Sequence, residues 1–138
     1  MTRQAFRKIL SANDTGQTKS HQAGMLIPKG DSEFRDFLGS LDPGVKNPRR
    51  AIVCLDDDGE KLELQYIYYN NKLHDERGTR NEYRLTCLTA YLRQNGARAG
   101  DEVEISKDDD EPFYRIFFIP QAQTLPTKIL LRGWRRVH

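Results

Sequence analysis

The chain has 138 residues, of which 37% are hydrophobic and 30% are charged, and its formal net charge at pH 7 is only +2. This length suits a single domain spanning residues 1–138, and the aromatic residues give it a core, which excludes a wholly disordered chain. No apolar run reaches the roughly 18 residues of a membrane span, and the N-terminus lacks the apolar region of a signal peptide. We therefore expect a soluble, cytoplasmic protein without a membrane partner.

The two cysteines are too few for a disulfide framework. Neither Cys54 nor Cys87 has a second Cys or a His at the spacing of zinc ligands, so we expect both to pack as small buried side chains. Acidic residues gather in two runs, 56–60 and 108–111, which we expect to be solvated hairpin tips. Outside these runs basic residues are in surplus, so an electropositive face is expected despite the small net charge.

The first part of the chain predicts two strands, an arm and a helix. Residues 4–10 and 25–28 are short apolar runs typical of strands, and the polar stretch 11–24 between them predicts an extended arm. After a capping residue at position 31 or 32, apolar residues recur at the three- and four-residue spacing of one helical face. The residues with this spacing are Phe34, Phe37, Leu38 and Leu41.

The middle of the chain predicts a hairpin followed by a second polar arm. Two apolar runs within residues 50–69 flank Asp58 and Gly59, a pair of residues that suits a tight turn between strands. Residues 70–78 predict a polar loop, and residues 79–84 predict an extended polar arm.

The last part predicts one more helix and three strands. The helix contains residues 88–94 and ends at Asn95 and Gly96, whereas residues 102–106, 112–120 and 128–137 predict strands. About seven short strands, two short helices and no alternation of strands with helices favour a mostly β fold, an antiparallel barrel or open barrel.

Residue types of hydrolytic enzymes are present, but their settings are not. The three histidines, His21, His74 and His138, have no G-x-S-x-G nucleophile motif beside them. The acidic run 56–60 lacks the ligand spacing of a calcium loop, and a magnesium-dependent nuclease needs paired acids that converge from rigid strands. We therefore predict no metal site and no cofactor, and keep a magnesium-dependent nuclease at this hairpin as an alternative.

The two polar arms carry the side chains that suit recognition of DNA. The arm 11–24 consists almost wholly of small and hydrogen-bonding residues, and alternation along 79–84 places two arginines and a glutamate on one face of a strand. In the major groove, Arg pairs with guanine, Asn with adenine and Glu with cytosine. An exposed edge strand whose charges prevent aggregation explains the same composition equally well.

Two longer motifs give these arms a family resemblance. The run RKILSANDTGQTKSHQAGMLIPKG at 7–30 and the run IYYNNKLHDERGTRNEYR at 67–84 resemble the N-terminal effector-binding domain of EcoRII-type restriction endonucleases. Its pattern is close to K-R-L-S-A-N-D-T-G, H-Q-x-G-x-x-I-P and Y-Y-N followed by T-R-N-E-x-R. The run NGARAGDEVEIS at 95–106 resembles the B3 family of plant transcription factors, which shares that fold.

The resemblance implies a B3-like DNA-binding pseudobarrel, a seven-stranded open β-barrel with two short helices that clasps the major groove between an N-arm and a C-arm. It implies recognition of a CCWGG-like site, with Arg80 and Arg84 as base or phosphate donors and Glu82 as a cytosine acceptor. The N-arm candidates are Asn13, Asp14, Thr15, Gln17, Lys19, His21 and Gln22. The C-arm candidates are Arg77, Thr79, Arg80, Asn81, Glu82, Tyr83 and Arg84. Charge and proximity to the arms add Arg7, Lys8 and Lys29 as phosphate contacts.

The chain departs from the family pattern at three positions. Leu26 replaces an aromatic residue, and Gly78 and Tyr83 replace lysines, each of which would donate to a phosphate or a base. EcoRII-type enzymes carry their nuclease in a separate C-terminal domain, so we expect no catalytic residue here. Double-stranded DNA is the expected partner, and a separately encoded nuclease subunit is compatible with it. A protein-interaction module whose arms bind an acidic partner is a third interpretation.

Overall fold

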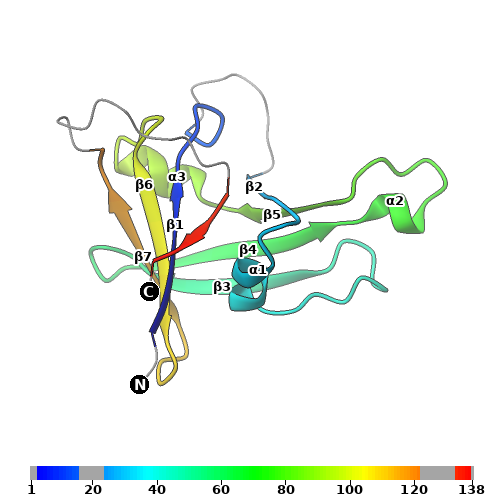
Figure 1. Cartoon of the computed structure of the whole chain (residues 1–138), viewed down its shortest axis with the longest axis horizontal. Helices are drawn as coiled ribbons and strands as arrows, with labels where there is room; N and C mark the ends of the chain where they lie inside the picture. The colour runs from blue at the N-terminus through cyan, green and yellow to red at the C-terminus, as the bar shows by residue number, and fades with distance from the viewer. Residues whose placement is uncertain (1–2, 16–23, 122–132, 138) are drawn as a thin grey trace.

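A computed structural model describes residues 3–15, 24–121 and 133–137, and in them one sheet of eight strands is accompanied by three short helices (Figure 1). The predicted mostly β open barrel is confirmed, with eight strands and three helices in place of seven and two. No helix in these residues is long and apolar enough to cross a membrane. The elements are β1 (Arg3–Ile9), β2 (Met25–Ile27), α1 (Ser32–Leu38), β3 (Arg49–Leu55), β4 (Lys61–Tyr69), α2 (Asn71–His74), β5 (Glu82–Thr86), α3 (Thr89–Gln94), β6 (Glu102–Asp108), β7 (Tyr114–Ile119) and β8 (Arg135–Arg136).

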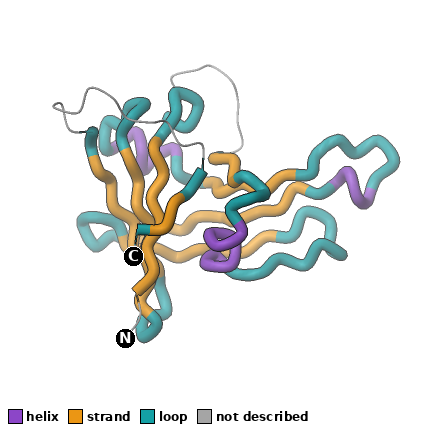
Figure 2. Tube along the Cα trace, in the orientation of Figure 1, coloured by secondary structure: helices purple, strands orange, loops and turns teal. Residues whose placement is uncertain are grey.

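The sheet has the strand order β2-β5-β4-β3-β7-β6-β1-β8 and curls into an open half-barrel. Its two halves, β2-β5-β4-β3 and β7-β6-β1-β8, join through a short parallel contact in which Cys54 pairs with Tyr114 and Leu55 with Arg115. All other strand pairs are antiparallel. Figure 2 shows the strands of one half running across those of the other. Figure 1 shows the segment after β4, with α2, projecting beyond the sheet.

The core fills the inside of the curled sheet and is closed by α1. Phe34 of α1 stacks on Trp134, with ring centroids 4.2 Å apart, and meets Phe6 of β1 edge to face at 5.3 Å. Cys54 is buried as expected, and burial raises the pKa of its thiol to about 12. Cys87 is exposed, contrary to the prediction, because it follows the end of β5 in a turn with a φ of 72°.

The β3–β4 hairpin turns at Asp58 and Gly59, as predicted, and the φ of 80° at Gly59 is one that glycine adopts without strain. Its tip is not simply solvated. One carboxylate oxygen of Asp57 accepts a hydrogen bond from the Tyr91 hydroxyl of α3, and the other accepts one from the backbone N–H of Phe118 at 3.0 Å. The tip therefore fastens the hairpin to α3 and β7.

Three further boundaries differ from the prediction. The helix after residue 31 ends at Leu38, where Gly39 follows with a φ of 112°. The loop 70–78 contains the short helix α2, whose four residues are too few for a periodic pattern in the sequence. Of the strand predicted at 128–137, residues 128–132 lie outside the described residues, and within 133–137 only Arg135–Arg136 form a strand.

Candidate nucleic-acid interface

The C-arm, which we define as residues 70–84, leaves the sheet after β4 and returns in β5. Figure 1 shows it projecting with α2 away from the rest of the sheet. Asn70 is fully buried at its base, where its side-chain oxygen accepts the N–H of Asn47 at 2.7 Å and its amide nitrogen donates to the carbonyl of Val45 at 2.9 Å. The backbone N–H of Asn70 donates in return to the side chain of Asn47 at 3.1 Å. The two asparagines thus lock the arm to the loop 42–48.

Asn71, the residue after Asn70, closes the turn of the C-arm. The side-chain oxygen of Asn71 accepts the N–H of Arg80 at 2.8 Å, and the N–H of Lys72 donates to the Arg80 carbonyl at 3.0 Å. A Cβ at Gly78 would lie 2.1 Å from the Asn71 carbonyl oxygen, so a side chain there would collide with backbone. The departure from lysine at this position is therefore required by this turn.

The two arginines and the glutamate meet on one face of the segment 80–84, which leads into β5, as the alternation predicts. The Arg80 Nε donates to one carboxylate oxygen of Glu82 at 2.9 Å, and an Arg84 amino group donates to the other at 3.1 Å. Burial alone would raise the pKa of Glu82, but the hydrogen bonds from Arg84 and Arg80 outweigh it and hold the pKa below its ordinary value. Glu82 is therefore an ionised acceptor near neutral pH.

The two arginines have different surroundings. The Arg80 guanidinium lies over the Tyr69 ring, 3.9 Å from its centroid, and its side chain is about one third exposed. Arg84 is only 8% exposed, and it also donates to the carbonyl of Gly24 at 3.0 Å, which ties β5 to the end of the N-arm. Arg80 is thus the more accessible of the two.

Asn81 and Tyr83 project from the opposite face, also as the alternation predicts. Tyr83 stacks on Tyr68 with centroids 4.2 Å apart and planes 8° apart. The guanidinium of Arg35 in α1 also lies over the Tyr83 ring, 4.5 Å from its centroid. The Tyr68 hydroxyl donates to the side-chain oxygen of Asn81 at 2.5 Å. In this structure Tyr83 therefore supports the arm by packing, and Asn81 supports it by a hydrogen bond.

The N-arm, which we define as residues 11–24, is described at its two ends only. The N–H of Ser11 donates to the Asp14 carboxylate at 2.9 Å, and the N–H of Asp14 donates to the Ser11 hydroxyl at 3.1 Å. Asn13 is exposed, and the Thr15 hydroxyl donates to the Ala12 carbonyl at 3.1 Å. The N-arm candidates that lie outside the described residues are Gln17, Lys19, His21 and Gln22.

Lys8 does not fit the phosphate role that charge suggested. Its side chain points inward from β1, is 4% exposed, and forms an ion pair with Asp14. Asp14 is correspondingly an anchor of the arm in this structure. Arg7 is ion-paired with Glu104 at 2.8 Å but remains partly exposed. Lys29 is exposed, and so are the C-arm residues Arg77 and Thr79.

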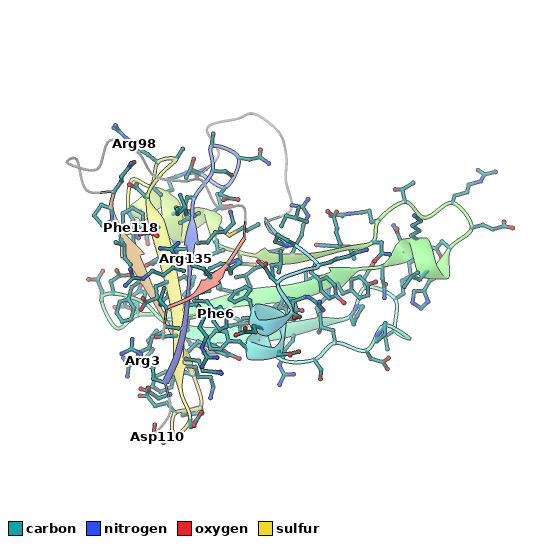
Figure 3. The ribbon with its side chains drawn as sticks, viewed as in Figure 1. Arg3, Phe6, Arg98, Asp110, Phe118 and Arg135 are labelled. Atoms are coloured by element: carbon teal, nitrogen blue, oxygen red, sulfur yellow. The ribbon has the colours of Figure 1, made fainter. Side chains whose placement is uncertain are left out.

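The acidic hairpin does not gather its carboxylates at one point. Asp56 accepts the N–H groups of Asp58 and Glu60, both at 2.9 Å, while Asp57 turns toward Tyr91 and Phe118. Within the described ranges no three His, Cys, Asp or Glu side chains are grouped as metal ligands. Figure 3 shows Asp110, in the other acidic run, at the tip of the β6–β7 hairpin and away from the C-arm.

Comparison with known proteins places this geometry in a family. Residues 2–95 match the family described as the N-terminal part of the restriction endonuclease EcoRII. The type II restriction enzyme EcoRII of Escherichia coli is 34% identical over 88 residues, which are 59% of this chain and 20% of that enzyme. The chain thus matches about one fifth of the length of this relative.

A solved structure shows the same fold. The Arabidopsis FUS3-DNA complex superposes with a TM-score of 0.61 at 22% identity, covering 84% of this chain and 96% of that one. This likeness confirms the predicted B3-like pseudobarrel. Because the family match covers more than half of the residues, the chain belongs to the family of EcoRII N-terminal domains.

Proposed function

We propose that the chain binds double-stranded DNA in a sequence-specific manner, with the C-arm and the N-arm placed in the major groove. The observation that carries the proposal is the hydrogen-bonded group formed by Arg80, Glu82 and Arg84 at the start of β5. It falls on the T-R-N-E-x-R motif of the family. The family relative is a restriction enzyme, and the fold relative was solved with DNA, which supports DNA as the ligand.

The chemistry of the group fits base edges. A guanidinium carries five N–H donors in a planar fork, so Arg80 keeps donors for a guanine while one edge holds Glu82. Glu82 keeps lone pairs that can accept from the amino group of cytosine. Because Arg80 is also supported by the Tyr69 ring, the group is organised before DNA binds, and less side-chain entropy is lost on binding.

We propose the following contacts, which rest on the exposure and pairing of the described candidates and on the family motif for the others. Arg80 and Glu82 read bases, and the buried Arg84 aligns Glu82. Lys29, Arg77 and Arg7 contact phosphates. Asn13, Thr15 and the candidates between 16 and 23 supply the N-arm contacts. Lys8 and Asp14 anchor the arm to β1.

The same proposal holds that the chain recognises DNA but does not cleave it. A nuclease partner, encoded with it or separately, would supply cleavage, and a CCWGG-like sequence is the proposed site. The experiment that tests recognition is selection of bound duplexes from a random pool. We expect a short consensus related to CCWGG. Recovery of the unselected base composition would contradict sequence-specific binding, and magnesium-dependent nicking by the purified chain would contradict recognition without cleavage.

A further inference from the structure

One row of side chains crosses four strands on the face that carries the C-arm group. In the sheet register, Arg49 of β3 pairs with Ile67 of β4, Ile67 pairs with Arg84 of β5, and Arg84 pairs with Leu26 of β2. Residues directly opposite each other on adjacent strands project from the same face. Arg49 on β3 therefore projects from the same face of the sheet as Arg84 on β5, with β4 between them.

Arg49 differs from Arg80 and Arg84 in having a charge that is unpaired among the described residues. Arg80 and Arg84 share Glu82, whereas Arg49 is exposed and its side chain has no hydrogen bond or ion pair with another described residue. An exposed, unpaired guanidinium keeps all of its donors for an anionic ligand. Its neighbour Arg50 projects from the opposite face, where its guanidinium lies beside Gly39 at the end of α1.

The start of β3 is held in a fixed relation to the C-arm. The carbonyl of Pro48 accepts the N–H of Tyr68 at 3.0 Å, and Asn47, with a φ of 50°, exchanges two hydrogen bonds with Asn70. The residues immediately before Arg49 are therefore fastened to the base of the arm. The hydrogen bonds between Asn47 and Asn70 that fasten the C-arm therefore also position Arg49.

We propose that Arg49 contacts a DNA phosphate and extends the DNA-binding surface from the C-arm to strand β3; this inference rests on the proposed function. Two strand spacings separate Arg49 from Arg84, about 10 Å. A major groove is about 12 Å wide. When the C-arm group reaches base edges, a cation at this offset faces the phosphates that border the groove, and it adds affinity for every sequence.

Arg49→Ala and its matched control Arg50→Ala test the proposal, because the two changes remove the same charge from adjacent residues on opposite faces. Binding is measured by fluorescence anisotropy with the selected duplex and with a scrambled duplex, over a series of salt concentrations. We expect Arg49→Ala to weaken binding of both duplexes by the same factor, several-fold, and to reduce the log-log salt slope by about 0.9. Arg50→Ala leaves the slope unchanged, and Arg49→Lys retains most of it.

The outcomes separate this inference from the function on which it rests. If the wild type binds no duplex, the proposed function itself is wrong. If the wild type binds but Arg49→Ala and Arg50→Ala weaken binding equally, only net charge matters and the role of Arg49 is wrong. A loss confined to the selected duplex would also overturn it, since that result would assign Arg49 to a base. Thermal unfolding of both variants shows whether each remains folded.

Discussion

The two ends of strand β4 carry polar loops that differ in charge and in the partners of their carboxylates. At one end, Asp57 in the hairpin tip accepts from a tyrosine hydroxyl and a backbone N–H, so its carboxylate is occupied by the protein itself. At the other end, Glu82 is bound by two arginines, of which the more exposed, Arg80, keeps N–H groups for a ligand. Residues 56–60 hold four acidic residues and no basic one, whereas residues 70–84 hold three acidic and four basic residues. The proposed DNA-binding role therefore falls to the end where the carboxylate is paired with arginines.

The largest effect is expected where the C-arm is fastened. Asn70→Ala removes a buried side chain that accepts one hydrogen bond and donates to the carbonyls of Val45 and Pro43. Leaving such buried groups unpaired lowers the free energy of unfolding by about 3 kcal/mol. Asn47→Gly is the control, because glycine keeps the φ of 50° but loses one acceptor, and we expect about 1 kcal/mol. Urea denaturation measures both, and equal losses would contradict the lock.

The next effect concerns binding at the C-arm. Arg80→Ala should weaken binding of the selected duplex by about 2 kcal/mol and relax the consensus at one base pair, because a two-donor contact to guanine is lost. Binding of a scrambled duplex should change much less. The measurement is the ratio of the two dissociation constants. An unchanged ratio would assign Arg80 to phosphate or to the packing of Tyr69.

The next prediction concerns the hydrogen bonds of the Asp57 carboxylate in the hairpin tip. Asp57→Ala leaves the Tyr91 hydroxyl and the Phe118 N–H without their acceptor, and we expect a loss of about 1 kcal/mol in the free energy of unfolding. Asp58→Ala, next in the chain and exposed, should stay within about 0.5 kcal/mol of wild type. DNA affinity should not fall in either folded variant. A lower affinity for DNA in Asp57→Ala, with folding intact, would give the acidic tip a functional role.

The smallest expected effect is a pH dependence. The pKa of Glu82 is lowered, so its pairing contributes stability above the ordinary value of 4.5, and this is lost as pH falls through the lowered pKa. In Arg80→Ala one of the two arginine partners is removed, and the pKa of Glu82 should move upward toward its ordinary value. Carboxyl NMR titration of the two proteins measures the difference. A lower pKa in the variant would contradict the pairing.

The parts of the site that follow from local pattern could be predicted from sequence. A two-residue alternation places Arg80, Glu82 and Arg84 together, and Asp58 with Gly59 indicates the hairpin turn. Both depend on residues within a few positions of each other. The motif T-R-N-E-x-R then adds the family to which that pattern belongs.

The parts that depend on distant partners could not be predicted in this way. Asn47 and Asn70 meet from different loops, and the sequence signals only the Y-Y-N motif. A lysine in a strand suggests a surface cation, because lysine is almost never buried unless its charge is paired. The burial of Lys8 depends on its ion pair with Asp14, which the sequence alone does not indicate. Asp57 resembles a solvated acid until Tyr91 and Phe118 are placed beside it.

The most direct test of the account is the affinity of the wild type for its selected duplex relative to a scrambled duplex of equal length, measured at one fixed salt concentration. Sequence-specific DNA-binding domains separate the two by about 10³-fold or more. We predict a ratio in that range for the wild type, reduced by Arg80→Ala to within about tenfold of unity. A wild-type ratio near one, with strong salt dependence, would show that the basic face binds DNA without reading it and would contradict the role assigned to the C-arm.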